Sequence, residues 1–410
     1  MWGINNSTRP IILIGTDDRH DLIEEMQKKL SLVLLNEVQA EYNPQKYFTD
    51  KAPNIKLIES LRGKHVYVIT DPNSNDANAA WYVSSINDRY MYARAITKTA
   101  KDFGAKTTNQ IFTTFPYARD DKYDDVWNNK NTTRKPNLAN LAVEDAINDG
   151  NAYCITLDLH NPATFNRSKS TNFVNLGIGW IFEEIMKDIE KEDITISGCD
   201  EWSLKKIRAV AKDFKSPVLI TLKQKDYSQE QQVDIISVYG NIEWRDIVLY
   251  DDMLDTGGTL MKTIEEIAKH KPNSVNIVVT HGLFNGDALD KIEKAYQKGL
   301  FRKLYITDTV KRKNLPNYIQ TIETSTIFAR TIESIVKEEG INFNNNEAFP
   351  ELSPFYNSAM AKIGSLDPKT QIILPNNGLR VMKPVSDIRK ELDAQTEHWL
   401  SLAKTIHMIG

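Results

Sequence analysis

Short runs of β-branched and other apolar residues alternate with amphipathic stretches along most of the chain, and this alternation limits the possible folds most strongly. Strand–helix–strand units place parallel strands side by side and cover both faces of the sheet with helices. We therefore expect an α/β protein built on parallel sheets. The expected strands are Ile11–Ile14, His65–Thr70, Gln110–Phe115, Tyr153–Leu157, Val218–Leu222, Ile247–Tyr250, Val275–Thr280 and Leu304–Thr307.

The alternation fills two separate stretches, which predicts two doubly wound domains. We place these domains at residues 1–165 and 166–350, followed by a C-terminal extension at residues 351–410. The extension ends in a helical pattern over Ile388–Ile406, whose apolar stripe must pack on the chain itself or on a neighbouring subunit. The clearest helical stripes before it are Leu260, Ile264, Ile267 with Ala268, and Leu289, Ile292 with Tyr296.

The composition narrows the functional class. The 51 Lys and Arg residues nearly balance 55 Asp and Glu residues, so a nonspecific nucleic-acid surface is not expected. The two cysteines, Cys154 and Cys199, are too few for a disulfide scaffold and favour a reduced setting. No apolar stretch approaches the ~18 residues of a membrane span, and the N-terminus lacks a signal-peptide core. We therefore expect a cytoplasmic protein without nucleic-acid or membrane partners.

The strongest local motif is a turn rich in glycine and threonine between the expected strand Ile247–Tyr250 and a helix. Backbone N–H groups at a helix start point outward and favour a phosphate. Gly257 and Gly258 remove side chains that would keep an anion away, and Thr256 and Thr259 can add hydroxyl donors. The segment therefore predicts a phosphate-binding loop.

Three carboxylates accompany this loop. Asp251 and Asp252 end the expected strand, and Asp255 lies in the turn. Carboxylates do not hold phosphate, but they suit sugar hydroxyls or a hydrated Mg²⁺. A threonine-capped turn without a ligand is the alternative for a bare Thr-Gly-Gly-Thr. The accompanying carboxylates favour a site for a sugar phosphate.

The segment Asp251–Thr259 resembles the phosphoribosyl-binding loop shared by type I phosphoribosyltransferases and ribose-phosphate pyrophosphokinases. This resemblance implies that Thr256–Thr259 bind the phosphate of ribose 5-phosphate, and that Asp251 and Asp252 bind its ribose hydroxyls. Asp255 belongs to the same binding set. The resemblance also implies domains of the type I phosphoribosyltransferase-like kind.

Other motifs separate the two families. Phe115–Lys122 resembles the Pro-Tyr-x-x-Tyr-Ala-Arg-Gln-Asp segment of the pyrophosphokinases, whose Arg and Gln contact ATP. Arg119 matches the arginine, which implies ATP binding and a catalytic role. Asp120 replaces the glutamine and is counted among the ATP-binding residues by its position. Phe48 and Asp50 match residues that lie at the adenine in the family, which implies that both bind ATP.

Asp158-Leu159-His160 resembles a family motif at the ATP phosphates. Strand alternation places Asp158 and His160 on one face at the carboxyl end of a strand, where open α/β sheets bind ligands. A hydrogen-bonded core pair is the alternative for a lone Asp-x-His. The resemblance implies that His160 binds a metal ion and ATP, and that Asp200 is a second metal ligand.

The chain departs from the family at several positions. Lys51 and Ala52 stand where the family has Gly and Glu, and Trp202 and Ser203 replace two glycines after Asp200. These changes remove a carboxylate and restrict the approach of backbone to a substrate.

A lysine pair matches the start of the family's catalytic loop. Lys223 matches the catalytic lysine, and Lys225 replaces an arginine, which keeps the charge but loses the planar two-pronged donor. Asp226–Gln232 is polar, as a mobile lid should be. A solvated loop with incidental lysines is the alternative.

The ordered matches together resemble a divergent ribose-phosphate pyrophosphokinase (PRPP synthetase). The resemblance implies a Mg²⁺-dependent kinase of nucleotide biosynthesis that transfers the diphosphoryl group of ATP to the anomeric hydroxyl of ribose 5-phosphate, giving PRPP and AMP. It also implies a homo-oligomer built from dimers, as in the hexamers common in the family. Three different functions stay open: the same chemistry on another acceptor such as ADP-ribose, a phosphoribosyltransferase, or a non-catalytic regulatory homologue.

Overall fold

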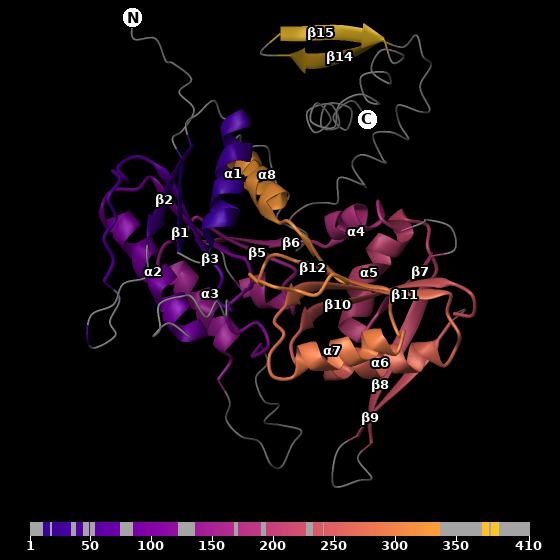
Figure 1. Ribbon diagram of the computed structural model, residues 1–410. Coiled ribbons are helices and arrows are strands. Elements are labelled where there is room, and N and C mark those ends of the chain that lie inside the picture. Colours follow the sequence, from indigo (N-terminus) through magenta and orange to yellow (C-terminus); the bar gives the residue numbers. More distant parts are fainter. Residues whose placement is uncertain are drawn as a thin grey trace, which may run out of the picture. The chain divides into compact units, whose positions relative to one another are not determined.

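The computed structural model describes residues 11–16, 19–33, 38–43, 49, 54–73, 85–121, 136–167, 171–189, 194–226, 233–240, 242–336, 371–376 and 379–384. The chain divides into two units, residues 1–348 and residues 349–410. The first unit contains a parallel sheet and a mostly parallel sheet, which with their helices form the first half and the second half (Figure 1). None of the helices in the described ranges is long and apolar enough to cross a membrane.

The sheet of the first half has six strands in the order β2-β1-β3-β4-β5-β6, and all neighbours are parallel. Both faces of β1 are buried, because Ile12 and Ile14 pack in a cluster with α2 and α3 while Ile11 and Leu13 are buried on the opposite face. The elements are β1 Ile11–Thr16, α1 His20–Val33, β2 Val38–Asn43, β3 His65–Thr70, α2 Ile86–Asp102, β4 Thr107–Phe112, α3 Leu138–Asn148, β5 Tyr153–Leu157, the 3₁₀ helix η2 Pro162–Arg167 and β6 Asn172–Leu176.

The sheet of the second half has seven strands in the order β13-β12-β11-β10-β7-β8-β9, and β9 alone is antiparallel to its neighbour. Alternate residues of β10 face different helices: Leu249 packs with α6 and α7, whereas Tyr250 packs with α4 and α5. The elements are α4 Gly179–Ile185, β7 Ile194–Gly198, α5 Glu201–Asp213, β8 Val218–Asp226, β9 Val233–Tyr239, β10 Asp246–Leu254, α6 Gly258–Ala268, β11 Ser274–Gly282, α7 Ala288–Gln297, β12 Lys303–Thr307, β13 Ile319–Ile322 and α8 Ser325–Val336.

The two doubly wound parallel-sheet domains are therefore confirmed, with differences at their edges. The expected first domain ends at residue 165, yet β6 pairs with β5 and extends the first sheet to Leu176. The final helix of the second half, α8, packs against α1 of the first half, as Figure 1 shows. Lys29 of α1 donates a hydrogen bond to Ser325 of α8 at 2.6 Å.

Two local expectations are wrong. The strand expected at Gln110–Phe115 is β4, which starts at Thr107 and ends at Phe112, because Thr107 already pairs with His65 of β3. The stripe expected on α7 is shifted. Leu289 and Tyr296 are each 40% exposed, and the buried side chains are Ala288, Ile292 and Ala295.

The halves meet through the carboxyl ends of their sheets. Asp71 follows β3 and accepts the backbone N–H of Lys311 at 3.3 Å. Thr113 follows β4 and donates its hydroxyl to the carbonyl of Thr309 at 2.6 Å. Lys311 and Thr309 follow β12, so strand ends from both sheets lie against each other.

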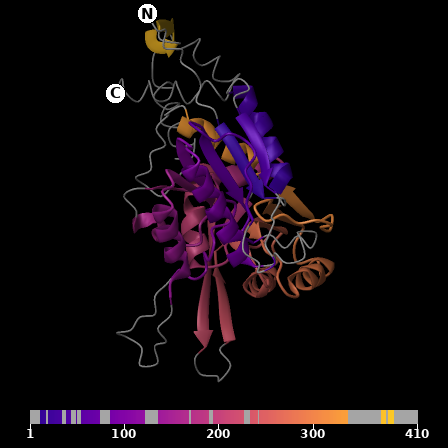
Figure 2. The same ribbon diagram turned by 90° about the vertical axis from the view of Figure 1, so that its left-hand side faces the viewer.

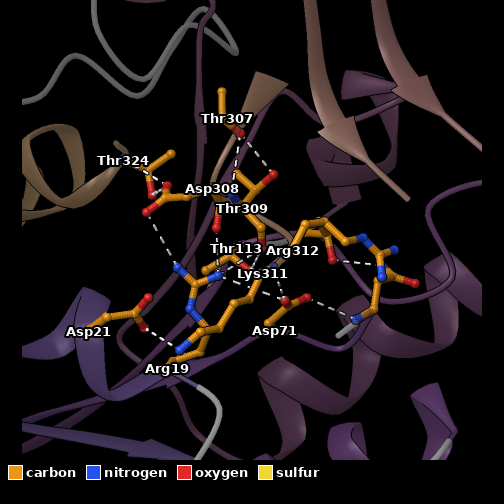
Figure 3. A network of polar contacts seen from close by, with 12 residues as sticks. Arg19, Asp21, Asp71, Thr113, Thr307, Asp308, Thr309, Lys311, Arg312 and Thr324 are labelled. Atoms are coloured by element: carbon orange, nitrogen blue, oxygen red, sulfur yellow. Dashed lines mark hydrogen bonds and ion pairs between the residues drawn. The ribbon is translucent and has the colours of Figure 1, made fainter. Parts of the chain in front are cut away.

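A buried arginine lies at the centre of this junction (Figure 3). Arg19, which has no exposed surface, donates to the backbone carbonyls of Asp308 at 2.6 Å and Thr309 at 3.3 Å. Its guanidinium also lies 3.8 Å from the carboxylate of Asp71 and 3.7 Å from that of Asp308. This Arg19 network ties the loop after β1 to the loop after β12.

Two pairs of antiparallel strands lie outside the parallel arrangement. The antiparallel strands β8 and β9 form a hairpin that extends away from the body of the second half (Figure 2). In the second unit, β14 Gln371–Asn376 and β15 Leu379–Pro384 pair as antiparallel strands. The helical ending expected over Ile388–Ile406 lies outside the described residues.

Candidate active site

The expected phosphate loop joins β10 to α6. The sequence places Asp251 and Asp252 at the end of the strand, but β10 continues to Leu254, because Met253 and Leu254 still pair with β11. The two carboxylates therefore belong to a rigid strand. The turn itself is the short stretch from Asp255 to Gly257.

Gly257 caps the N-terminus of α6 with φ of 73°, a left-handed conformation that glycine adopts without strain. Because glycine has no side chain, Gly257 does not cap the first N–H groups of α6. At Gly258, an added Cβ would meet no atom within 4 Å. The loop is therefore open where a phosphate would approach.

A cleft of about 320 Å³ contains this loop. It brings residues of both halves together, because Arg119 and His160 come from the first half and Asp200 comes from the second. The other lining residues are Asp251, Asp252, Met253, Leu254, Asp255, Thr256, Gly257, Gly258, Thr259 and Leu260. The seven residues predicted to bind ribose 5-phosphate all line it, together with three of those predicted for catalysis, ATP or metal.

His160 and Asp252 form the central contact of the cleft. The ring Nδ1 of His160 lies 2.7 Å from Asp252 Oδ2, and an imidazole N–H donates to the carboxylate. This hydrogen bond raises the pKa of His160 above its ordinary value. Burial opposes the ionisation of Asp252, but the positive charge of Lys206 and the bond from His160 hold its pKa below the usual range. The contacts with Lys206 and His160 therefore favour the ionised form of Asp252.

Strand alternation predicts that Asp158 and His160 share one face of a strand, but neither residue belongs to a strand. The strand β5 ends at Leu157, and Asp158 turns the chain with φ of 48°. Its buried carboxylate accepts the hydroxyls of Tyr250 and Thr280 and the ammonium of Lys206. These donors all belong to the second half, so they direct the side chain of Asp158 toward it.

Asp200 has a local structural role as well as its place in the cleft. Its side chain caps α5 by accepting the N–H of Ser203 at 2.8 Å. The hydroxyl of Ser203 in turn lies 3.3 Å from Asp251 Oδ1. Burial, reinforced by the carboxylates of Asp252 and Asp200, raises the pKa of Asp251 well above its usual range.

Arg119 reaches from the first half to the phosphate loop. Its guanidinium forms an ion pair with Asp255, which also accepts the side-chain amide of Asn285 at 2.8 Å. The arginine is 62% exposed, so solvent screens this ion pair and little free energy opposes its release.

The structure does not gather the whole predicted site. Asp120 is not among the residues that line the cleft, although it adjoins Arg119. Phe48, Asp50, Lys51 and Ala52 lie outside the described residues.

For the two lysines that are predicted to be catalytic, the structure describes the backbone only. Lys223 and Lys225 are not at the start of a loop but within β8, opposite Ile236 and Asp234 of β9. Their side chains, and residues 227–232, lie outside the part of the chain that the structure describes.

A metal ion fits the chemistry of the cleft. No group of three or more His, Cys, Asp or Glu side chains within the described ranges is arranged as a metal centre. Mg²⁺ usually binds one or two protein carboxylates and fills its other positions with water and substrate phosphates. Burial is the main cause of the raised pKa of Asp251, but Asp252 and Asp200 add to it, and a cation would offset the negative charge of these two neighbours. His160 and Asp200, both at the cleft, suit such a partial ligand set.

The residues predicted for the site do not include Lys206, which the family resemblance matches only as a basic residue after Asp200. Its ammonium lies 2.7 Å from Asp158 and 3.3 Å from Asp252, and its side chain is 15% exposed. The available signal was helical spacing, since Lys206 shares the buried stripe of α5 with Ser203, Ile207 and Val210. A lysine on an apolar stripe predicts a buried partner of opposite charge.

Two family models match the chain. The N-terminal domain of ribose phosphate pyrophosphokinase matches residues 11–135, and the phosphoribosyl transferase domain matches residues 169–304. The ribose-phosphate pyrophosphokinase of Wolinella succinogenes is 25% identical over 295 residues, which cover 72% of this chain and 88% of the relative. That of Mycoplasma pneumoniae is 23% identical over 334 residues, 78% of this chain and 91% of the relative.

The fold also resembles that of a solved structure. The phosphoribosylpyrophosphate synthetase of Mycobacterium smegmatis superposes with a TM-score of 0.67 at 19% sequence identity. The match covers 81% of this chain and 100% of that chain. The likeness in fold therefore includes both halves.

Proposed function

Because the chain belongs to the ribose-phosphate pyrophosphokinase family, we propose that it transfers the diphosphoryl group of ATP to the anomeric hydroxyl of ribose 5-phosphate, giving PRPP and AMP. One observation carries the proposal. A single cleft joins a phosphate loop from the second half to Arg119 and His160 from the first half. A site for two anionic substrates needs this combination of an anion-binding turn and nearby cations.

The sugar phosphate occupies the loop. The N–H groups at the start of α6 and the hydroxyls of Thr256 and Thr259 bind the 5-phosphate. Asp251 and Asp252 accept the ribose hydroxyls, and Asp255 completes the set. Because Asp251 and Asp252 lie on β10, the sugar is held against a rigid strand. This placement aligns the anomeric oxygen for attack on the β-phosphorus of ATP.

The cations act on the triphosphate. Arg119 leaves Asp255 and binds ATP phosphates, while Lys223 and Lys225 stabilise the charge that develops during transfer. Phe48 and Asp50 hold the adenine, and Asp120 lies beside Arg119 at the border of the ATP site. The position of both lysines on one arm of the β8–β9 hairpin supports a lid that closes over bound substrates.

A magnesium ion completes this proposal. His160 and Asp200 would hold it, and when bound it would supply positive charge that neutralises the ATP phosphates. Asp252 orients His160 through the 2.7 Å bond to Nδ1, which leaves Nε2 as the ring nitrogen for the metal or the nucleotide.

The proposed activity is tested by incubating the protein with ATP, ribose 5-phosphate and Mg²⁺ and measuring AMP and PRPP by mass spectrometry. Equal amounts of AMP and PRPP are expected. ADP in place of AMP would contradict diphosphoryl transfer. The same assay with ADP-ribose tests the alternative acceptor, which the altered segment Gly198–Ser203 motivates.

A phosphoribosyltransferase and a regulatory homologue would each give a different result. A phosphoribosyltransferase would share the Asp251–Thr259 loop, but it does not need Arg119 or His160 in the cleft. It would consume PRPP with a base and release pyrophosphate. A regulatory homologue, which Lys51, Ala52 and Trp202 motivate, would release no product and would change the activity of a catalytic partner.

We also propose a cytoplasmic homo-oligomer built from dimers, up to a hexamer, that works in nucleotide biosynthesis. Both cysteines, Cys154 and Cys199, are buried free thiols, which suits a reducing compartment. Sedimentation with and without ATP tests the assembly, and a monomer under both conditions would refute it.

A further inference from the structure

Lys206 links carboxylates from the two halves beside the cleft. Its Nζ lies 2.7 Å from Asp158 Oδ1 in the first half and 3.3 Å from Asp252 Oδ2 in the second. An ammonium group donates three hydrogen bonds, and two carboxylates occupy most of that capacity. Lys206 also does not line the cleft. Its direct contacts are therefore these two carboxylates.

The partner in the first half is held firmly. Asp158 is buried, and its second oxygen, Oδ2, accepts the hydroxyls of Tyr250 and Thr280. With one oxygen held by these hydroxyls, the other presents a fixed acceptor to Lys206. The ammonium position is therefore set by a carboxylate that does not itself face the cleft.

The other contact of Lys206 leads to the cleft. The same oxygen of Asp252 that lies near Lys206 accepts the hydrogen bond from Nδ1 of His160. We propose that Lys206 is a positioning residue, which holds Asp252 so that His160 keeps its Nδ1–H bonded and its Nε2 available to the cleft. The proposal rests on the proposed function for what the cleft binds, but the orientation of His160 does not depend on it.

A double variant distinguishes the positioning role of Lys206 from a purely structural role. Removing the ammonium leaves Asp158 and Asp252 without their shared cation, so Lys206→Met destabilises the junction under either hypothesis. Changing Asp158 to Asn in addition removes one of the two negative charges. The double variant therefore restores much of the stability and still lacks the cation at Asp252, which separates positioning from stability.

Four variants form the test: Lys206→Met, Lys206→Arg, Lys206→Met with Asp158→Asn, and the control Lys212→Met on the exposed part of the same helix. The measurements are Tm, kcat and KM for AMP release, and the tautomer of His160 by long-range ¹⁵N correlation at a pH where the ring is neutral. Loss of such a supporting residue costs ~10–100-fold in activity. We expect that loss in kcat for both Lys206→Met variants, with a Tm near the original in the double variant.

The ring signal provides the readout that needs no substrate. The unaltered protein and Lys212→Met should show the single tautomer with the proton on Nδ1, and both Lys206→Met variants should show a mixture. Lys206→Arg keeps the charge and should recover part of the lost kcat and the single tautomer. If the double variant regains kcat with its Tm, or if His160 keeps one tautomer without Lys206, the positioning role is refuted. Absence of AMP release by the unaltered protein would refute the proposed function, and the ring signal would still test Lys206.

Discussion

Replacing Arg19 by methionine tests how much the junction between the halves contributes to stability. Methionine keeps an unbranched stem of similar length but removes the guanidinium from beside Asp71, which has no exposed surface. The carbonyls of Asp308 and Thr309 lose their donor as well. Asp71 keeps its hydrogen bonds from the N–H groups of Asn73 and Lys311, at 3.0 and 3.3 Å, but these carry no full positive charge.

The expected loss is large, because breaking a buried ion pair on one side costs about 3–5 kcal/mol. In a domain of 150–250 residues, 1 kcal/mol shifts Tm by roughly 2–4 °C, so Arg19→Met should lower Tm by roughly 6–20 °C. The matched control is Lys28→Met on α1. Lys28 forms an exposed pair with Glu25, and because solvent screens such a pair, its loss should leave Tm almost unchanged.

Thermal unfolding followed by circular dichroism measures both changes. The double variant Arg19→Met with Asp71→Asn completes a double-mutant cycle and should recover part of the loss, since position 71 then no longer carries a buried negative charge that the Arg19 guanidinium would offset. A Tm for Arg19→Met within about 2 °C of the original, the shift from less than 1 kcal/mol, would show that this network does not stabilise the junction through charge. A double variant whose losses simply add would lead to the same conclusion.

Three other changes test the cleft. Gly258→Val should raise KM for ribose 5-phosphate most and leave Tm unchanged, since a Cβ there meets only open space; a change in KM for ATP alone would contradict the loop assignment. Lys223→Ala should lower kcat by ~10²–10³-fold with little change in KM, and near-normal turnover would favour an incidental lysine. The pKa of His160 is raised in the folded protein, so its contribution to stability is present below its unfolded value and is lost as pH rises through the folded one. The Tm difference between the original protein and His160→Ala should therefore be larger at pH 6 than at pH 9, and an equal difference would contradict the Asp252 contact.

The sequence predicts some inner strands well, although it does not predict the inner strand β7, Ile194–Gly198. Strands β3 and β5 have the predicted bounds, because a strand covered on both faces needs a nearly continuous apolar run. The edge strand β2, Val38–Asn43, is half polar and gives no such run. Strand β9 lies outside the strand–helix alternation, because it pairs as an antiparallel hairpin.

One part of the candidate site can be predicted from the sequence, and another part cannot. The phosphate loop is contiguous, so its glycines and threonines identify it without knowledge of the fold. The contacts among Asp158, Lys206 and Asp252 join residues of different halves, and no periodicity relates their positions. The left-handed turn at Asp158 also breaks the alternation on which its predicted orientation depends. Only the folded chain brings these groups together.

The packing of α8 on α1 has a consequence for synthesis of the chain on the ribosome. The two helices are neighbours in space, yet roughly 290 residues separate the end of α1 from the start of α8, which take ~15–60 s to translate at ~5–20 residues per second. During that interval the first half has emerged, but the surface of α1 that receives α8 has no cover. A nascent chain stalled before Ser325 should therefore recruit chaperones or expose protease sites in α1 that the finished protein protects.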